Sequence, residues 1–110
     1  MKKAAIELFN LKGKKAVISG GAGFLGPRHA EALLDAGAEV VLVDINKDKL
    51  KSVVTNLREK YGPRVFGYCC DITSEKKVAA LFEKVNRKHG FIDILINNAA
   101  ATDHKTIFTI

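Results

Sequence analysis

The sequence predicts an α/β domain built on a doubly wound parallel sheet, and three observations support this prediction. Short apolar runs alternate with amphipathic stretches of helical length along the chain. A glycine cluster at 20–26 follows the first apolar run directly, and Asp44 ends the second run. Strands that alternate with helices form right-handed βαβ units, so we expect the order β-α-β-α-β-α-β with the strands arranged 3-2-1-4.

The first half of this pattern depends on two apolar runs and the helix between them. Residues 16–19 are expected to form the first strand. The helix that follows carries Ala30, Leu33 and Leu34 and ends at Gly37, a residue type that favours helix termination. Val40–Val43 is continuous and β-branched, which is typical of a strand buried on both faces.

The second half repeats the pattern with two longer helices. Asn46 is placed to cap a helix that Gly62 and Pro63 end, and Thr73 is placed to cap another that ends at Gly90. Their apolar stripes have helical spacing: Leu50, Val53, Val54 and Leu57, then Val78, Leu81, Phe82 and Val85. Residues 65–70 and 92–96 are expected to be the third and fourth strands.

Composition indicates one globular domain. The chain has 110 residues, and 47% of them are hydrophobic, enough to form a buried core. The net charge is +6, but the lysines and arginines are spread along the chain without interleaved aromatics. Such a spread is typical of solvated helix faces, so we expect no nucleic-acid partner.

The two cysteines and the N-terminus predict a cytoplasmic protein without a membrane partner. Cys69 and Cys70 are adjacent, which suits neither a disulfide framework nor a metal site, and they indicate a reducing compartment. Glu7 and Asn10 interrupt the apolar stretch that a signal peptide requires. No apolar run has the length needed to span a membrane.

The glycine loop from Ser19 to Gly26 predicts a phosphate-binding turn that includes Phe24 and Leu25. Gly20 permits a tight exit from the strand, and Gly23 lets the backbone approach a pyrophosphate. We expect Gly26 to let the helix pack closely on the sheet. The free N–H groups and positive dipole end of that helix would then receive the phosphates.

Polar residues at three further strand ends complete the expected site. Asp44 comes 18 residues after Gly26, where a carboxylate accepts both ribose hydroxyls of an adenosine and repels a 2′-phosphate, which favours NAD over NADP. Alternatively, Asp44 only ends a strand ahead of Asn46. Asp71-Ile72 and Asn97–Ala100 follow the third and fourth strands. Asp71 alternatively caps a helix, and the asparagines alternatively satisfy backbone groups.

Together these segments resemble the short-chain dehydrogenase/reductase family, over about residues 10–105. The most specific segments are Cys70–Thr73 and Asp93–Ala100. The resemblance implies that residues 1–110 are a Rossmann-like NAD-binding domain of an oxidoreductase. The complete enzyme would transfer hydride between a nicotinamide and a small carbonyl or alcohol substrate, as a homo-oligomer.

The resemblance also assigns roles to individual positions. It implies that Asp71 and Ile72 contact the adenine, that Asn98, Ala99 and Ala100 line the adenosine side, and that Asn97 stabilises the central strand. The full expected cofactor-binding set is Ser19, Gly20, Gly23, Phe24, Leu25, Gly26, Asp44, Ile45, Asp71, Ile72, Asn98, Ala99 and Ala100. Ser19 replaces the usual Thr and Ala100 replaces the usual Gly. The glycine spacing resembles the larger, sugar-nucleotide-modifying branch, whereas the asparagine motif resembles the smaller single-domain branch.

The family's catalytic Ser and Tyr-x-x-x-Lys pair are expected downstream. Tyr61 and Tyr68 are followed four residues later by Val65 and Ile72, not by lysine, so no catalytic residue is assigned within this sequence. We expect the 110 residues alone to bind a dinucleotide weakly and to be inactive, as the part of a sheet whose catalytic half is missing. Two alternatives remain open here: a non-catalytic nucleotide-binding module and an S-adenosylmethionine-dependent methyltransferase.

Overall fold

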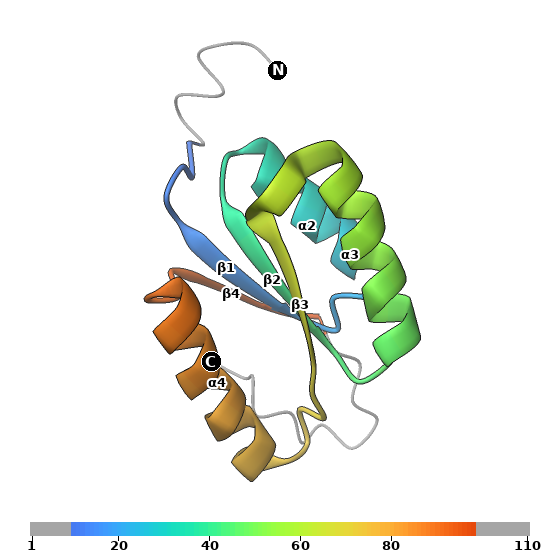
Figure 1. Ribbon diagram of the computed structural model, residues 1–110, viewed down its shortest axis with the longest axis vertical. Helices are drawn as coiled ribbons and strands as arrows, with labels where there is room; N and C mark the ends of the chain where they lie inside the picture. Colours follow the sequence, from blue (N-terminus) through green and yellow to red (C-terminus); the bar gives the residue numbers. More distant parts are fainter. Residues whose placement is uncertain (1–9, 99–110) are drawn as a thin grey trace.

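The computed structural model of the chain describes residues 10–98, in which strands and helices alternate (Figure 1). The strands are β1 (Lys15–Ser19), β2 (Glu39–Asp44), β3 (Val65–Cys69) and β4 (Ile94–Asn97). The helices are α2 (Gly26–Asp35), α3 (Lys47–Tyr61) and α4 (Glu75–His89), and a 3₁₀ turn, η1 (Gly62–Arg64), joins α3 to β3.

The four strands form one parallel sheet in the order β3-β2-β1-β4, which confirms the predicted topology. The register pairs Ile18 of β1 with Leu42 of β2 and with Ile96 of β4. Helices α2 and α3 cover one face of the sheet and α4 covers the other (Figure 1). Because all strands are parallel, their carboxyl ends meet at one edge, where the glycine loop also lies.

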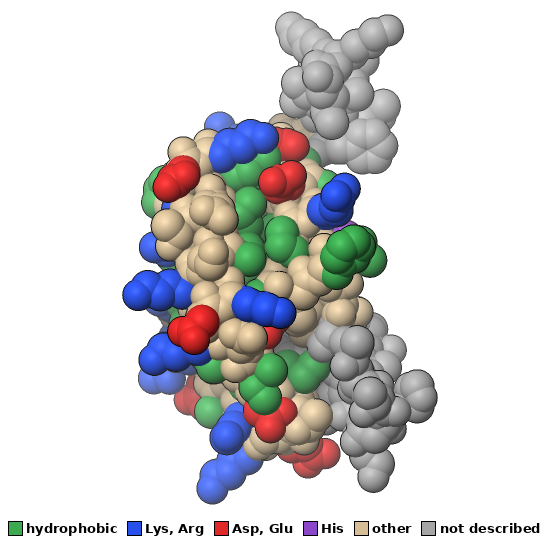
Figure 2. Space-filling view, turned by 90° about the vertical axis from the view of Figure 1, so that its right-hand side faces the viewer, with side chains coloured by type: hydrophobic (Ala, Val, Ile, Leu, Met, Phe, Trp, Pro, Cys, Tyr) green, Lys and Arg blue, Asp and Glu red, His purple; other side chains and the backbone are tan. Residues whose placement is uncertain are grey.

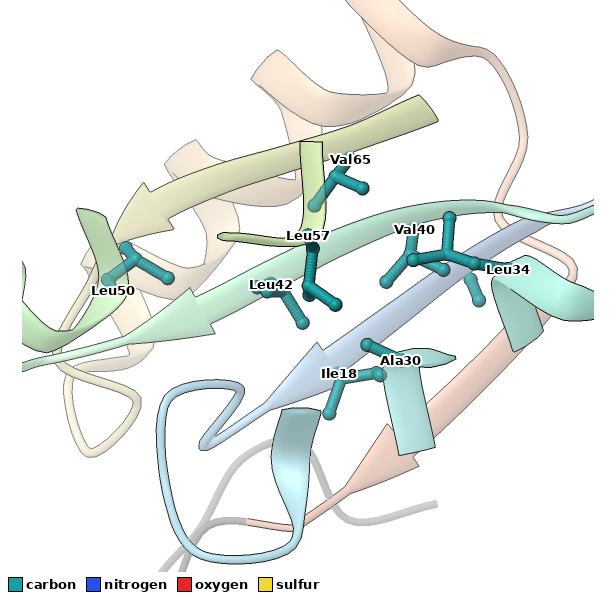
Figure 3. Close-up of a cluster of buried hydrophobic side chains, with 9 residues drawn as sticks. Ile18, Ala30, Leu34, Val40, Leu42, Leu50, Leu57 and Val65 are labelled. Atoms are coloured by element: carbon teal, nitrogen blue, oxygen red, sulfur yellow. The ribbon is translucent and has the colours of Figure 1, made fainter. Parts of the chain in front are cut away.

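The core has two layers because the sheet is packed on both faces. One layer joins side chains of β1 and β2 to Leu34 of α2 and Leu57 of α3 (Figure 3). The other packs β1 and β2 against the stripe Val78, Leu81 and Val85 of α4. Val40–Val43 is at most 1% exposed, which confirms that β2 is buried on both faces.

Most predicted helix ends are confirmed, and one cap is wrong. The Asn46 side chain accepts a hydrogen bond from the Lys49 amide at 3.0 Å, and Gly37 follows α2 with a φ of +101°. The cap of α4 is Ser74 rather than Thr73: the Ser74 hydroxyl accepts from the Lys77 amide at 3.3 Å. Thr73 is instead the donor in a turn closed by Asp71, which delays the start of the helix.

Two strand boundaries also differ from the prediction. Strand β3 ends at Cys69 instead of continuing to Cys70, and β4 begins at Ile94 instead of Ile92. Asp93 precedes β4 and is fixed differently: its amide donates to the Lys15 carbonyl, and its carboxylate accepts from the Lys15 amide at 2.9 Å. One backbone bond and one side-chain bond thus take the place of regular strand pairing at that point.

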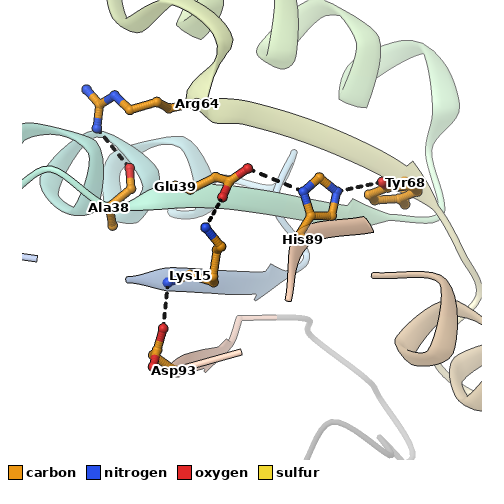
Figure 4. A network of polar contacts seen from close by, with 7 residues as sticks. All are labelled: Lys15, Ala38, Glu39, Arg64, Tyr68, His89 and Asp93. Atoms are coloured by element: carbon orange, nitrogen blue, oxygen red, sulfur yellow. Dashed lines mark hydrogen bonds and ion pairs between the residues drawn. The ribbon is translucent and has the colours of Figure 1, made fainter. Parts of the chain in front are cut away.

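A polar network fastens the end of α4 to the sheet (Figure 4). His89 is 7% exposed, with Nδ1 lying 3.3 Å from Glu39 Oε1 and Nε2 lying 2.8 Å from the Tyr68 hydroxyl. Lys15 Nζ lies 2.7 Å from the other oxygen of Glu39. One buried imidazole therefore links β1, β2 and β3 to α4, at the amino ends of β1 and β2.

On the face shown in Figure 2 the charged side chains are dispersed, and side chains of both signs surround a strip of hydrophobic ones.

Between residues 10 and 98, no helix combines the length and the hydropathy that crossing a bilayer requires. In the same range, no cluster of three or more His, Cys, Asp or Glu side chains is placed to hold a metal ion.

Candidate functional site: a cavity at the carboxyl ends of the strands

A cavity of about 500 Å³ opens at the carboxyl ends of the strands. Residues from the glycine loop and from the ends of β2, β3 and β4 line it: Gly20, Gly23, Phe24, Leu25, Val43, Asp44, Ile45, Cys70, Asp71, Ile72, Thr73 and Asn98. Its position outside the strand ends is where open parallel sheets bind ligands. The three strand ends and the loop therefore form one site.

The glycine loop is held by close backbone contacts. Gly20 has a φ of +67°, which lets the chain turn sharply out of β1. The Gly21 amide donates to the Val43 carbonyl at 3.0 Å, and a Cβ at Gly21 would lie 2.7 Å from Cβ of Leu42. Gly21 is thus a glycine whose packing role the sequence pattern did not reveal.

Gly26 has a different role from the one predicted. A Cβ at this position would lie 2.5 Å from the Gly21 carbonyl oxygen and 2.6 Å from that of Gly20. The close approach is therefore between the first turn of α2 and the loop itself, rather than between α2 and the sheet. Gly26 lets the loop fold back over the start of the helix.

The amino end of α2 is left available to an anion, unlike the ends of the two longer helices. Asn46 and Ser74 cap α3 and α4, and an acidic residue lies in the first turn of each. Helix α2 has neither a side-chain cap nor an acidic residue in its first turn. Its unpaired N–H groups and positive dipole end lie directly after Leu25, which lines the cavity.

Asp44 connects β2 to the glycine loop. Its Oδ2 accepts from the Ala22 amide at 3.0 Å, and its Oδ1 accepts from the Asn46 amide at 2.9 Å. A carboxylate offers about four acceptor positions, so roughly two remain for a ligand. Asp44 therefore positions the loop while facing the cavity.

The wall after β3 contains a rigid turn. Asp71 Oδ1 accepts from the Thr73 amide at 3.0 Å and from the Thr73 hydroxyl at 2.6 Å. These bonds, the hydroxyl first, hold the pKa of Asp71 below its ordinary value. Cys70 precedes the turn and lines the cavity, and burial raises the pKa of its thiol.

The end of β4 is tied to the end of β1. The Ser19 hydroxyl donates to the Asn97 side-chain oxygen at 2.8 Å, and the Asn98 amide donates to the Ser19 carbonyl. The Asn98 side chain donates to the Gly20 carbonyl at 3.3 Å. These bonds fix the first glycine of the loop against the neighbouring strand.

The structure brings most of the sequence-predicted residues together around the cavity. Ser19 and Gly26 do not line it: Ser19 is fully buried beneath the rim, and Gly26 lies behind the loop. Ala99 and Ala100 lie outside the described residues. Val43, Cys70 and Thr73 line the cavity without having been predicted. The Asp-x-Thr spacing is a turn signal that could have revealed Thr73.

A parallel sheet with a glycine loop after β1 and an acid after β2 defines a nucleotide-binding α/β protein. The model of the short chain dehydrogenase family matches residues 14–109. The chain therefore belongs to the short-chain dehydrogenase family. This membership decides against the methyltransferase alternative.

Individual relatives agree with the family match. The chain is 41% identical over 93 residues to the short chain dehydrogenase/reductase dpchG of Colletotrichum higginsianum, covering 84% of this chain and 34% of that protein. It is 42% identical over 89 residues to 7alpha-hydroxysteroid dehydrogenase of Escherichia coli, covering 81% and 34%. The chain thus spans about a third of the length of these two curated relatives.

Solved structures show the same fold. A crystal structure of NAD⁺-bound xylitol dehydrogenase superimposes with a TM-score of 0.78 at 34% identity, covering 83% of this chain and 35% of that one. A crystal structure of hydroxysteroid dehydrogenase from Escherichia coli gives a TM-score of 0.77 at 40% identity, covering 84% and 39%. The relatives that are named for an activity are oxidoreductases, which assigns this chain to an oxidoreductase family.

Proposed function

We propose that this chain is the NAD-binding part of an oxidoreductase that moves hydride between the nicotinamide and a carbonyl or alcohol carbon of a small molecule. The observation that carries the proposal is the pairing of an uncapped α2 with the Asp44 carboxylate in one cavity. The uncapped amino end of α2 suits an anionic group, and the Asp44 carboxylate suits a vicinal diol. A dinucleotide contains both groups.

The residues present fit this cofactor. Gly23 lines the cavity without a side chain, and a Cβ there would already lie 3.2 Å from the Gly20 carbonyl oxygen, so backbone can approach the pyrophosphate at this position. Asp44 would accept the ribose hydroxyls, and Ile45 and Ile72 would enclose the adenine. NAD supplies the hydride-accepting carbon when bound. The chain's own contribution is to bind the adenosine half and to orient the rest of the cofactor.

The preference for NAD over NADP is part of the proposal. The hydrogen bonds that Asp44 accepts from the amides of Ala22 and Asn46 hold its carboxylate in place. The carboxylate therefore cannot rotate away from a 2′-phosphate without breaking them. No arginine occupies the positions directly after Asp44, which are Ile45, Asn46 and Lys47. Repulsion between the carboxylate and a phosphate would therefore disfavour NADP.

Substitution of Asp44 in the full-length enzyme tests this function. Asp44→Ala should weaken NAD binding about ten- to a hundredfold, because a charged hydrogen bond contributes roughly 1.5–3 kcal/mol. Asp44→Asn keeps an acceptor for the Ala22 amide but loses the charge, so it should mainly relax discrimination against NADP. Asp48→Ala, on the first turn of α3, is the matched control. If kcat/KM for both cofactors is unchanged in Asp44→Ala, the carboxylate does not hold the ribose.

A further inference from the structure

The outer edge of β3 carries a groove that the cofactor site does not use. Strand β3 has β2 on one side and no strand on its other side among residues 10–98. A hollow of about 280 Å³ lies between this edge and α4, lined by Cys69, Cys70, Lys77, Ala80, Leu81 and Lys84. Its floor is apolar and its rim is cationic. An edge strand with such a hollow beside it is a surface that an extended segment can occupy.

Cations approach this edge from both faces of the sheet. Lys77, Lys84 and Lys88 are seven and four residues apart, so they form one stripe along the side of α4 that faces β3. Lys84 Nζ lies 5.2 Å from the centre of the Tyr68 ring, and Lys88 Nζ lies 5.7 Å from that of Phe66. From α3, on the opposite face, the Arg58 guanidinium lies 5.5 Å from the Phe66 ring. The edge is therefore positive along its length.

These cations have few acidic partners nearby. The ion pairs found in the described part of the chain involve Lys15, Arg87 and His89, and none involves Lys84, Lys88 or Arg58. Lys77, in contrast, has an acidic side chain nearby, because its charge helps to lower the pKa of Asp71. A partner with carboxylates along an extended backbone would complement this charge.

The aromatic rings at the edge argue against a nucleic acid as the partner. The Phe66 ring packs on His89, with ring centres 4.3 Å apart, and is flanked by Arg58 and Lys88. Tyr68 meets His89 edge-on and has Lys84 over its ring. Both rings are engaged within the protein, whereas single-stranded nucleic acids bind to rings on which bases can stack.

We propose that the β3 edge, defined as residues 66–69 with Lys84 and Lys88, binds an acidic, extended segment of a partner protein. The segment pairs with β3 as an added strand and places alternate carboxylates over the lysine stripe. Arg58 Nε already donates to the Val65 carbonyl at 2.8 Å, so pairing starts after that residue. The methylene groups of these acidic side chains cover the hollow beside Ala80 and Leu81, and the intervening apolar side chains lie on the α3 face of the sheet.

The test is fluorescence anisotropy on the full-length protein, with a short labelled peptide in which Glu alternates with Val. We expect saturable binding that Lys84→Glu/Lys88→Glu weakens by about tenfold or more. The control Lys49→Glu/Lys51→Glu changes net charge equally on exposed positions of α3 and should alter binding by less than about twofold. Far-UV circular dichroism and melting curves establish that both variants remain folded.

Three further probes make the outcome decisive. A peptide with Lys in place of Glu should not bind, and one with methylated backbone amides should lose most of its affinity because it cannot pair as a strand. A labelled oligothymidylate should bind more weakly than the acidic peptide. The proposal is overturned if the acidic peptide does not bind, if both charge variants lose equal affinity, if methylation has no effect, or if the oligothymidylate binds better. If the acidic peptide does not bind, the lysines serve only to protect the edge from aggregation.

Discussion

Gly26→Ala tests whether close backbone contact sets the position of the glycine loop. A methyl group at this position would lie 2.5 Å from the Gly21 carbonyl oxygen, whereas ordinary contact begins at 3.4 Å. The difference between these distances requires a movement of about 0.9 Å. The three nearest atoms all belong to the backbone of Gly20 and Gly21, so no side-chain rotation can relieve the clash. The loop and its N–H groups must therefore shift away from α2.

Stability and cofactor binding should respond differently to this shift. Alanine favours a helix over glycine by up to about 1 kcal/mol, which offsets part of the roughly 1–3 kcal/mol cost of overpacking. The free energy of unfolding should thus fall by only about 1 kcal/mol. Displacing an oriented set of donors by about 1 Å is more damaging, and NAD affinity should fall about ten- to a hundredfold.

Calorimetric titration with NAD and urea denaturation of the full-length protein measure the two effects. Gly62→Ala is the control, because nothing lies within 4 Å of its Cβ but its φ is +72°. That variant should lose about 1–3 kcal/mol of stability through backbone strain and keep its NAD affinity. Unchanged NAD affinity in Gly26→Ala would show that the loop tolerates the methyl group and that its position does not determine binding.

Three further outcomes follow from individual contacts. Leu34→Ala removes a side chain that is 1% exposed and should lower the free energy of unfolding by about 2–5 kcal/mol in urea denaturation. Ser74→Ala should cost about 1 kcal/mol, more than Thr73→Ala, because Ser74 caps α4. Hydrogen bonds from Thr73 lower the pKa of Asp71 in the folded protein. The contribution of the ionised Asp71 to folding stability is therefore fully present at neutral pH and is lost as the pH falls through the folded-state pKa. Thr73→Val should raise the Asp71 titration midpoint measured by NMR.

The sequence predicts those parts of the fold that depend on local periodicity and on residue-specific end signals. The run Val40–Val43 predicts a strand buried on both faces because no polar side chain interrupts it. Asn46 predicts the start of a helix because its side chain can accept from an amide of the first turn. Gly37 predicts the end of a helix because glycine readily adopts a positive φ. The strand order follows from the handedness of βαβ units rather than from any single contact.

Contacts between distant residues are the part that the sequence does not predict. His89 and Glu39 are fifty positions apart, and neither belongs to a pattern that indicates the other. The contact of Gly26 with the loop carbonyls depends on how the turn folds back, which glycine spacing alone does not specify. For Asp44, the spacing predicts a carboxylate at the rim, but its bonds to Ala22 and Asn46 appear only in three dimensions.

The two edges of the described sheet differ in how they are protected. At β3, Arg58 donates to the Val65 carbonyl, and lysines from α4 flank the strand. At β4, Ile94, Leu95 and Ile96 are only partly buried, and the strand itself contains no charged residue. An apolar edge without charges favours strand pairing with a second copy of the chain, whereas the lysines of two identical edges repel one another. A chain limited to residues 1–110 should therefore associate through β4 rather than through β3.

Sedimentation velocity over a range of concentrations measures this association. We expect Leu95→Lys to reduce it by about tenfold, because a charge at the middle of β4 must be desolvated when two edges pair. Cys69→Lys places the same charge at the exposed end of β3 and should leave the association unchanged. Circular dichroism checks that both variants keep their helices. If the unsubstituted 110-residue chain is monomeric at high concentration and melts cooperatively, the side chains of β4 complete the core, and the argument from its exposed edge is wrong.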